Sequence, residues 1–404
     1  WRSGTTVKQD FAYGFMAGRR REQASLIQNA VTWSLREAAR CSPPNQKKFF
    51  SHVTTLRDVS NAFPSPKFTS LSRAVDGVLS GDAATLVKTR HEQAFMVIRS
   101  QKGPWVRLKT GCGGMQGDTI MPSQFDQLYG AKLKKVIRKR KRRGAVILAK
   151  DPISKRKLDV GTTGYADDIA ETKLATDRET LQSEINQSNA EMDSMLSRIG
   201  MAQNTGKAVH IIYAIGPGSP DYIRGTTQWS QEQEAGKVAS SDKYLGNIRE
   251  YRGGRTANLK RRMKCAQECY YSMAHFWTRK RVNQKRKNRI YKGLVENALL
   301  SGLEAECLTW SETEMLEKWN IRFLRKMIGQ DGSYDTQHGR RLKTNAQIRE
   351  IAETHTVGST LRKRRLDWIR QMIQTPDDNR QVRAAVFGRM DCTRDVEDMR
   401  ENPW

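Results

Sequence analysis

The stretch that decides the fold is Val160-Gly-Thr-Thr-Gly-Tyr-Ala-Asp167-Asp168-Ile-Ala170, in which short residues that strands tolerate surround two adjacent aspartates. This pattern predicts a β-hairpin with Asp167 and Asp168 at its tip. Two neighbouring carboxylates repel each other unless cations hold them, so the pair indicates divalent metal binding. Taken alone, the pair is also compatible with a solvated turn.

A further carboxylate supports the metal interpretation. The β-branched run from His52 ends on Asp58 and is followed by helix-like apolar positions at Val75, Val78 and Leu79, which predicts a strand and then a helix. A strand-end acid beside a hairpin-tip pair can collect two Mg²⁺ ions and so support phosphoryl transfer. A helix N-cap or turn acid is the alternative interpretation of Asp58.

Composition and charge point to the class of partner. The 404 residues are enough for two or three domains. Lys and Arg total 71 against 43 Asp and Glu, and this surplus of 28 positive charges indicates a polyanion such as nucleic acid. The apolar runs are far shorter than the roughly 18 residues that a membrane span requires, so no membrane association is expected.

The remaining global features concern origin and location. The chain opens at Trp1 without an initiator Met or a signal pattern, so we expect a fragment of a longer protein. Its six Cys are scattered rather than framed as in a small secreted scaffold, which favours a reducing, intracellular compartment, with the nucleus as one option.

Several segments around the acids have recognisable patterns. Residues 95–98 and 105–108 flank Lys102-Gly-Pro104 and predict a hairpin. Pro122 opens a predicted helix that runs into a tract with nine basic residues among the twelve from Lys132 to Arg143. That tract could bind nucleic acid, act as a nuclear address or be a solvated helix end. Thr176 with Glu179 predicts the capping box of the next helix.

From about residue 255 the pattern becomes helical. Between Arg255 and Lys292 the sequence has 13 Lys or Arg and one acidic residue, Glu268, so one helical face should be strongly positive. Capping boxes are predicted at two later helix starts, Ser311 with Glu314 and Thr344 with Gln347.

In chain order, several motifs resemble those of reverse transcriptases, in particular the enzymes of non-LTR retrotransposons. They are Asp58-Val-Ser-Asn-Ala-Phe63, Gln116-Gly117-Asp118 with Pro122 and Phe125, Tyr165-Ala166-Asp167-Asp168, Gly200 with Asn204 and Lys207, and Tyr244-Leu245-Gly246. Tyr13-Gly14-Phe15 with Gly18-Arg19 is similar to the early fingers motif of the family. The resemblance covers nearly the whole chain.

The resemblance implies an α/β fold with a right-hand polymerase architecture. Fingers and palm with an antiparallel sheet would occupy residues 1–250, with the N-terminal fingers truncated. An all-helical basic thumb would follow over 251–330, and a small helical C-terminal region over 331–404. No segment resembles an endonuclease or ribonuclease H domain.

The resemblance also implies a metal site. Asp58 and Asp167 would be the main ligands of two Mg²⁺ ions, Asp168 would complete the acidic cluster, and the backbone carbonyl of Val59 would be a further ligand. Mn²⁺ could replace Mg²⁺.

Other roles follow from the same resemblance. Phe63 would press against the sugar of the incoming nucleotide and exclude a 2′-hydroxyl. Gln116 and Gly117 would lie beside the nucleotide and the template, and Arg19 would contact the triphosphate. Lys207 would reach the departing pyrophosphate as a charge or a proton donor.

Binding of the nucleic acid itself is assigned to two further groups. Tyr244-Leu245-Gly246 would grip the primer strand. The duplex of RNA template and DNA primer would contact basic residues of the thumb, namely Lys260, Arg261, Arg262, Lys264, Lys285, Arg286 and Lys287. Deoxynucleoside triphosphates would be the substrates, and the sequence does not identify a protein partner.

The chain departs from the family pattern at three places, and two alternatives stay open. Arg57 stands where an apolar strand residue is usual, Pro64 replaces a usual acid, and Thr119-Ile-Met121 stands where Pro-Leu-Ser is commoner. A catalytically inactive nucleic-acid-binding remnant is one alternative. An RNA-dependent RNA polymerase is the other, against which Phe63 argues.

Overall fold

The chain divides into two compact units. The computed structural model describes residues 9–16, 18–40, 49–99, 103–114, 118, 120–175, 177–329, 333–336, 339–375 and 377–392. The first unit comprises residues 1–245 and 376–404, and the second comprises residues 246–375. The predicted C-terminal region that starts at residue 331 is therefore shared between the two units. In the described residues no helix combines the length and apolarity needed to cross a membrane.

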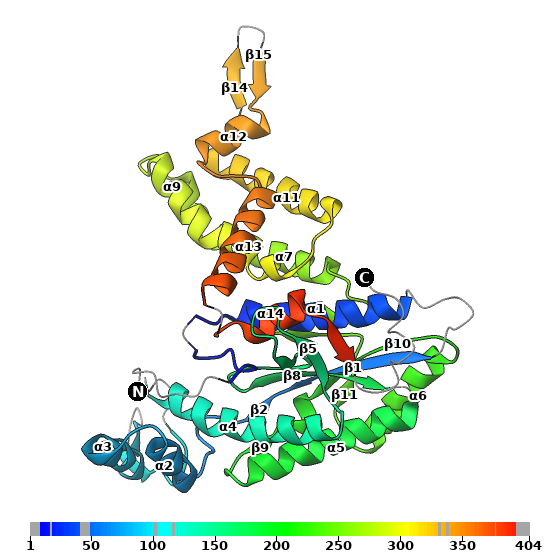
Figure 1. Cartoon of the computed structure of the whole chain (residues 1–404). Helices are drawn as coiled ribbons and strands as arrows, with labels where there is room; N and C mark the ends of the chain where they lie inside the picture. Colours follow the sequence, from blue (N-terminus) through cyan, green and yellow to red (C-terminus); the bar gives the residue numbers. More distant parts are fainter. Residues whose placement is uncertain are drawn as a thin grey trace. The chain divides into compact units, whose positions relative to one another are not determined.

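A five-stranded sheet forms the centre of the first unit (Figure 1). The order is β11 (Lys237–Val238), β10 (Val209–Ile215), β1 (Phe50–Arg57), β8 (Asp168–Ala175) and β7 (Thr162–Tyr165). All neighbours are antiparallel except β10 and β11. Seven of the eight β1 residues are buried, as expected for a central strand covered on both faces.

Helices cover both faces of this sheet (Figure 1). On one face lie α1 (Arg21–Arg40) and α14 (Arg380–Phe387); on the other lie α4 (Met121–Arg142), α5 (Arg178–Ser197) and α6 (Ser219–Glu232). The α4 stripe of Phe125, Leu128 and Leu133 at helical spacing packs into one core cluster with Met192 and Leu196 of α5.

Smaller elements complete the first unit. Helices α2 (Phe68–Asp76) and α3 (Gly81–Glu92) lead into the hairpin of β3 (Phe95–Ile98) and β4 (Val106–Lys109). The others are β2 (Val59–Ser60), β9 (Ala202–Gln203), the 3₁₀ turn η2 (Thr205–Lys207), β12 (Ser241–Tyr244), and the three-stranded sheet of β16 (Met390–Cys392), β5 (Ile147–Lys150) and β6 (Lys157–Asp159).

The second unit is mainly helical. Its elements in chain order are β13 (Asn247–Glu250), α7 (Thr256–Ser272), α8 (Ala274–Thr278), α9 (Gln284–Ile290), the π-helix η3 (Tyr291–Glu296), α10 (Asn297–Leu300), the 3₁₀ helix η4 (Leu303–Ala305), α11 (Trp310–Ile328), β14 (Ser333–Thr336), β15 (Gly339–Leu342), α12 (Asn345–Ile351) and α13 (Val357–Gln374). Its core is built around Tyr270, Trp277, Tyr291 and Phe323. The sequence predicted a helical region after residue 330. The structure corrects this, because β14 and β15 form an antiparallel pair there.

Two predicted helix caps need correction or qualification. The capping box of α11 is formed by Thr309 and Glu312, two residues before the predicted Ser311 and Glu314. Helix α5 begins after Asp177, whose side chain accepts from the Thr180 N–H at 2.6 Å; Thr176 lies outside the described residues. The predicted box of Thr344 with Gln347 is confirmed.

Helix α14 returns to the start of the chain. The Tyr13 hydroxyl donates to Gln381 Oε1 at 2.9 Å, and Gln23 Nε2 donates to Asn379 Oδ1 at 2.8 Å. Gln381 Nε2 also donates to the backbone oxygen of Thr162 at 2.8 Å, at the edge of the central sheet. Because these groups are buried, the two ends of the first unit depend on each other for hydrogen bonding.

Candidate active site

The register of the sheet brings the predicted acids together. In the antiparallel pairing of β1 with β8, Leu56 is opposite Ala170 and Arg57 is opposite Ile169. One step further along the same register, Asp58 would be opposite Asp168, and both line the same cavity. Asp167 lies in the turn between β7 and β8, as predicted. Carboxylates that are far apart in sequence thus meet at one end of the sheet.

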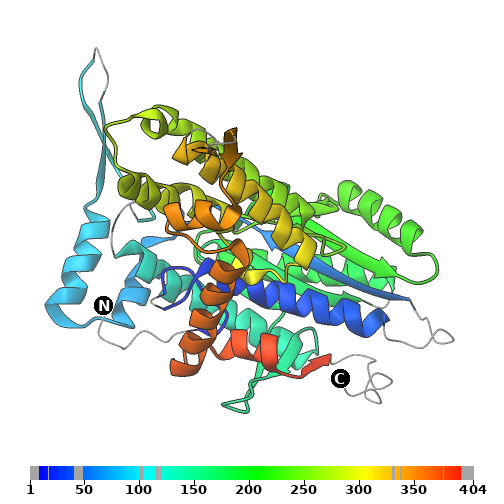
Figure 2. The same cartoon turned by 90° about the horizontal axis from the view of Figure 1, so that it is seen from above.

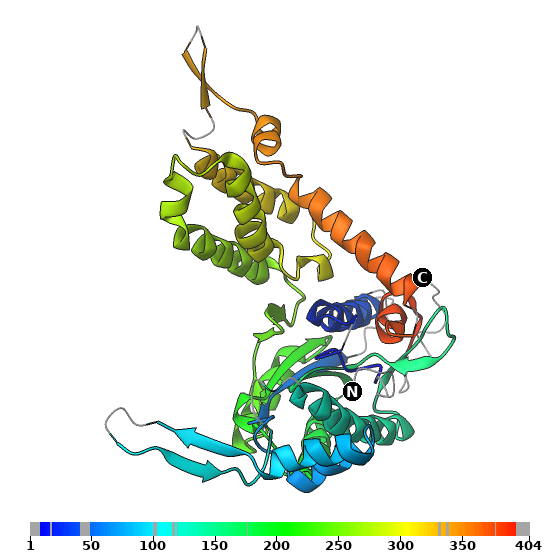
Figure 3. The same cartoon turned by 90° about the vertical axis from the view of Figure 1, so that its left-hand side faces the viewer.

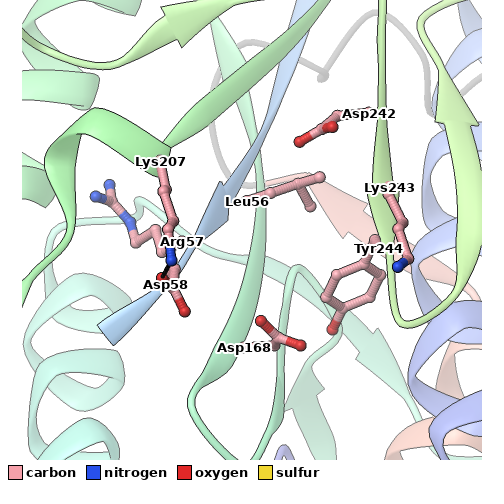
Figure 4. Close-up of a pocket in the computed structure, with 8 residues that line it drawn as sticks. All are labelled: Leu56, Arg57, Asp58, Asp168, Lys207, Asp242, Lys243 and Tyr244. Atoms are coloured by element: carbon pink, nitrogen blue, oxygen red, sulfur yellow. Dashed lines mark hydrogen bonds and ion pairs between the residues drawn. The ribbon is translucent and has the colours of Figure 1, made fainter. Parts of the chain in front are cut away.

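A cavity of about 240 Å³ opens beside these carboxylates (Figure 4). Its lining comes from β1, β8, the turn before β10, and β12, and consists of Leu56, Arg57, Asp58, Asp168, Lys207, Asp242, Lys243 and Tyr244. Figure 4 shows the Asp168 carboxylate between Asp58 and the Tyr244 ring, with Lys207 on the Asp58 side and Lys243 on the Tyr244 side.

The three acids influence one another electrostatically. Burial raises the pKa of Asp168 to about 6, and the charges of Asp167 and Asp58 add to this rise. Burial also raises the pKa of Asp167, to which Asp58 again adds, whereas Lys207 opposes the rise. A like charge shifts a pKa only when it is close. The pKa effects and the strand register therefore both place the three side chains near one another.

Two lysines counterbalance this negative charge. Lys207 Nζ lies 3.1 Å from Asp58 Oδ2, with 70% of the lysine side chain exposed and 27% of the aspartate side chain. Lys243 is exposed, and its charge lowers the pKa of Asp168. Sequence reasoning missed Asp242 and Lys243. Their position directly before the predicted primer-gripping Tyr244 is the signal that could have identified them.

The donor chemistry of the cluster fits a hard divalent cation. Carboxylate oxygens of Asp58, Asp167 and Asp168 are of the kind that Mg²⁺ prefers. Val59 lies in β2, paired with Gln203 of β9, immediately after Asp58. Within the part of the chain that the structure describes, no three His, Cys, Asp or Glu side chains are grouped as metal ligands. The acids are therefore neighbours whose side chains are not arranged around a common point.

A buried charge cluster anchors the strand that carries Asp58. Arg57 donates from Nε to Glu171 at 3.4 Å and from Nη2 to Ser188 Oγ at 2.9 Å. Arg140 of α4 also binds Glu171, and its Nε donates to Glu191 Oε2 at 2.8 Å. Figure 4 shows the Arg57 guanidinium pointing away from Asp168. The Arg57 guanidinium is thus held toward Ser188 of α5, while the Asp58 carboxylate faces the cavity.

The charge cluster also bears on the basic tract of residues 132–143. Burial alone would raise the pKa of Glu171, but Arg140 and Arg57 hold it below its usual range. Arg140 is fully buried in this cluster, and Arg143 lies 3.3 Å from Glu184. Arg140 and Arg143 of this tract therefore form ion pairs within the first unit.

Phe63 does not line the cavity. The Phe63 ring packs at a centroid distance of 5.2 Å from Phe125 and 5.9 Å from Phe15. It is partly buried against the core cluster of α4. Gln116 and Gly117 lie outside the described residues.

Arg19 is engaged away from the cavity. It is buried, its Nη1 donates to the backbone oxygens of Gln9 and Ala12, and its guanidinium lies 5.4 Å from the centre of the Tyr13 ring. Its contacts are with the turn at residues 9–13.

The predicted primer grip forms a tight turn. Tyr244 is buried, and its hydroxyl is 3.1 Å from Thr163 Oγ1 of β7. Leu245 and Gly246 follow with φ of 49° and 85°. Positive φ at both positions is typical of the central residues of a type I′ turn, and it is unusual for leucine.

The predicted duplex-binding residues fall into two groups. Lys260 and Lys264 of α7 and Lys285 and Arg286 of α9 are exposed. The other three make internal contacts: Arg261 and Arg262 donate to the Gly246 oxygen, and Lys287 Nζ donates to the Trp277 oxygen at 2.6 Å.

Comparison with known proteins gives weak structural likeness only. No protein-family model and no curated protein matches the chain. It is similar, with a TM-score of 0.40 and 11% identity, to telomerase from Candida tropicalis in complex with a TWJ fragment of telomeric RNA, over 89% of this chain and 47% of that chain. For telomerase from Candida albicans in complex with a TWJ fragment the values are 0.40 and 9%, over 83% and 58%.

The telomerase chains are much longer than the region that matches them. Apo telomerase from Candida tropicalis gives a TM-score of 0.40 and 10% identity, over 89% of this chain and 51% of that chain. This chain covers 38% to 58% of the four telomerase chains compared. Similarity at this level does not assign the chain to a family.

Proposed function

We propose that the chain is a template-directed nucleotidyltransferase of the reverse-transcriptase type, which adds deoxynucleotides to a primer 3′-hydroxyl. One observation carries this proposal. Asp58 and the pair Asp167–Asp168 come from separate sequence motifs, yet they meet at one end of the antiparallel strands β1 and β8, beside a cavity that Asp58 and Asp168 line. The order of the motifs along the chain supports the same conclusion.

The acids would hold two Mg²⁺ ions, or Mn²⁺ in their place. Asp58 and Asp167 would be the main ligands, with Asp168 completing the cluster and the Val59 carbonyl as a further ligand. Ions held there by these residues would supply positive charge for activating the attacking oxygen and for neutralising the leaving one. Burial and neighbouring acids raise the pKa of Asp168. A bound cation would therefore stabilise the ionised form of this carboxylate.

The chain's own cations would act on the phosphates. Lys207 is exposed at the cavity and paired with Asp58, from which it can turn to the departing pyrophosphate as a charge or a proton donor.

Phe63 would exclude a 2′-hydroxyl from the sugar site, because an aromatic ring fills that space without offering a hydrogen bond. Gln116 and Gly117 would lie beside the nucleotide.

The template and primer are proposed from the element type that the motifs resemble. The template would be RNA of a non-LTR retroelement and the primer DNA, so the chain would work in the nucleus. The exposed cations of α7 and α9 would contact the duplex backbone, and Tyr244 to Gly246 would hold the primer. In this reading the second unit is the thumb.

Primer extension tests the proposal. The purified chain, Mg²⁺ and deoxynucleotides are incubated with a labelled DNA primer on RNA or DNA templates, with a parallel gel-shift measurement of duplex binding. We expect extension on RNA. Binding without extension, under conditions where a known reverse transcriptase extends the same substrate, would identify an inactive remnant. Efficient use of ribonucleotides would identify an RNA polymerase.

A further inference from the structure

The β3–β4 hairpin is exposed on both faces. Each of its eight strand residues is exposed, although most are apolar. Figures 2 and 3 show both strands extending from the first unit beyond helices α2 and α3. Exposed apolar residues in contiguous groups mark interaction sites in soluble proteins. The exposed apolar residues therefore indicate that the hairpin binds a partner.

The strand register sorts the side chains into two different faces. Phe95 is opposite Lys109, and Val97 is opposite Arg107. Opposite residues of an antiparallel pair share a face, and the next pair in this register would be Arg99 with Trp105. One face, here called the aromatic–basic face, thus carries Phe95, Val97, Arg99, Trp105, Arg107 and Lys109. The other face is aliphatic and carries Met96, Ile98, Val106 and Leu108.

Ring contacts show that cations and aromatic rings on the aromatic–basic face are in register. The Arg99 guanidinium lies 4.0 Å from the Trp105 ring centre, and the Arg107 guanidinium lies 4.9 Å from that of Phe95. Trp105 remains 59% exposed and Phe95 44% exposed. Each ring is therefore covered in part by an arginine and open to a further planar group.

The charge of this segment has one sign. From Gln93 to Gly117 the sequence contains four cations, Arg99, Lys102, Arg107 and Lys109, and no acid. Cations without acids repel a basic protein surface and attract phosphates. The exposed aromatic rings beside these cations favour a single-stranded nucleic acid over a duplex, because bases can stack on protein rings only when they are unpaired.

We propose that the aromatic–basic face binds single-stranded nucleic acid, with Trp105 and Phe95 stacking on bases and Arg99, Arg107 and Lys109 contacting the backbone. If the chain is a polymerase, this strand is the unpaired template. That identification rests on the proposed function, whereas the binding itself depends only on the hairpin. A duplex does not present base faces to the rings and is a poorer ligand for them.

The direct experiment compares single-stranded and duplex binding in matched variants of the full chain. Trp105→Ala and Phe95→Ala are measured by fluorescence anisotropy with a labelled 15-nucleotide RNA and with a blunt duplex of the same length. Trp33→Ala is the control, because Trp33 is similarly exposed, at 56%, on α1 of the same unit. We expect each hairpin variant to weaken single-strand binding by about tenfold, within the range measured for base stacking on aromatic residues.

Further variants separate stacking from charge and from misfolding. Trp105→Phe keeps a ring and should restore most of the affinity. Arg99→Gln with Arg107→Gln should reduce the salt dependence of single-strand binding, which the aromatic variants leave unchanged. Equal losses on RNA and duplex, or equal losses in Trp33→Ala, would overturn the proposal. So would unchanged affinity together with an altered oligomeric state by light scattering, which would assign the face to a second copy of the chain.

This experiment is independent of catalysis. If the chain binds single strands through the hairpin but never extends a primer, the polymerase proposal fails and the hairpin proposal stands. If extension is observed and the hairpin variants bind and extend like the unmodified chain on templates with long single-stranded overhangs, the hairpin proposal fails alone.

Discussion

Lys207 Nζ lies 3.1 Å from Asp58 Oδ2, which joins the turn before β10 to the end of β1 across the candidate active site. Because most of the lysine side chain is exposed, the pair contributes no more than about 1 kcal/mol to stability. A contribution to folding stability is therefore a poor explanation for the position of Lys207. Its place at the cavity makes chemistry the better one.

Replacing Lys207 should separate catalysis from stability. For Lys207→Ala we expect single-turnover extension to slow by about 10²–10⁴-fold, the usual contribution of a positioned proton donor. The melting temperature should change little. Rapid-quench extension and thermal unfolding measure the two effects. A large loss of stability with an unchanged extension rate would mean that the lysine is structural.

The hairpin-tip acid should be indispensable for extension and dispensable for binding. For Asp167→Ala we expect extension to disappear while salt-sensitive duplex binding persists, since the exposed cations of α7 and α9 are unaltered. Asp242→Ala is the matched control, because Asp242 lines the same cavity outside the acidic cluster. Near-normal extension by Asp167→Ala would refute the metal role.

Phe63 should set the preference for deoxynucleotides. For Phe63→Ala we expect discrimination against ribonucleotides, measured as the ratio of kcat/KM values, to fall by at least about tenfold. Phe68→Ala removes another ring that packs on the same core cluster and controls for general loosening. An unchanged ratio in Phe63→Ala would remove the sugar-excluding role and leave a core aromatic.

The buried cluster below Asp58 should be costly to break. Removing the Glu171 carboxylate in Glu171→Ala leaves Arg57 and Arg140 buried without their shared acid. We expect the free energy of unfolding of the first unit to fall by about 3–5 kcal/mol. Urea unfolding measures it, with the exposed Glu179→Ala as the control, for which less than about 0.5 kcal/mol is expected.

Low pH should destabilise the first unit, in part because His210 is buried in its neutral form. Burial lowers the pKa of His210 to about 4, against 6.5 for the free side chain, and its Nε2 lies 2.8 Å from the Ala235 oxygen. A carbonyl only accepts, so Nε2–H donates and Nδ1 accepts from the Thr55 hydroxyl at 2.9 Å. The folded chain therefore holds a neutral imidazole.

The sign of the pH effect follows from that neutral state. Between pH 6.5 and 4 the unfolded chain binds a proton at His210 that the folded chain does not, so stability falls as the pH falls, by about 3 kcal/mol across the window. In His210→Gln the dependence of urea midpoints on pH should flatten over this window. His275→Gln, which alters an exposed histidine, should retain the full dependence; equal curves for all three proteins would exclude the role of His210.

The sequence predicted the elements that depend on local patterns. The hairpin carrying Asp167 and Asp168, the strand ending at Asp58 and the hairpin after α3 all form where alternation and turn residues predict them. Meeting of the acids was inferred from the family resemblance, and the register of β1 with β8 agrees with it.

Long-range partners were beyond prediction from local patterns. Arg57 looked like a departure from an apolar position, yet it is buried because Glu171 and Ser188 on other elements accept its hydrogen bonds. Lys243 reaches the cavity only because β12 lies there. The α11 cap was misplaced by two residues because Thr309 and Ser311 are both suitable capping residues, and only the backbone geometry separates them.

The hydrogen bonds between α14 and residues 9–23 affect the order in which the protein can fold during synthesis. A ribosome releases residues 246–375 before α14, although α14 belongs to the first unit. Until it emerges, Tyr13 and Gln23 lack the buried partners Gln381 and Asn379. One face of the central sheet therefore receives its covering helix α14 last, after the intervening unit has left the ribosome, and nascent chains that stop before α14 should be preferred targets of chaperones and proteases.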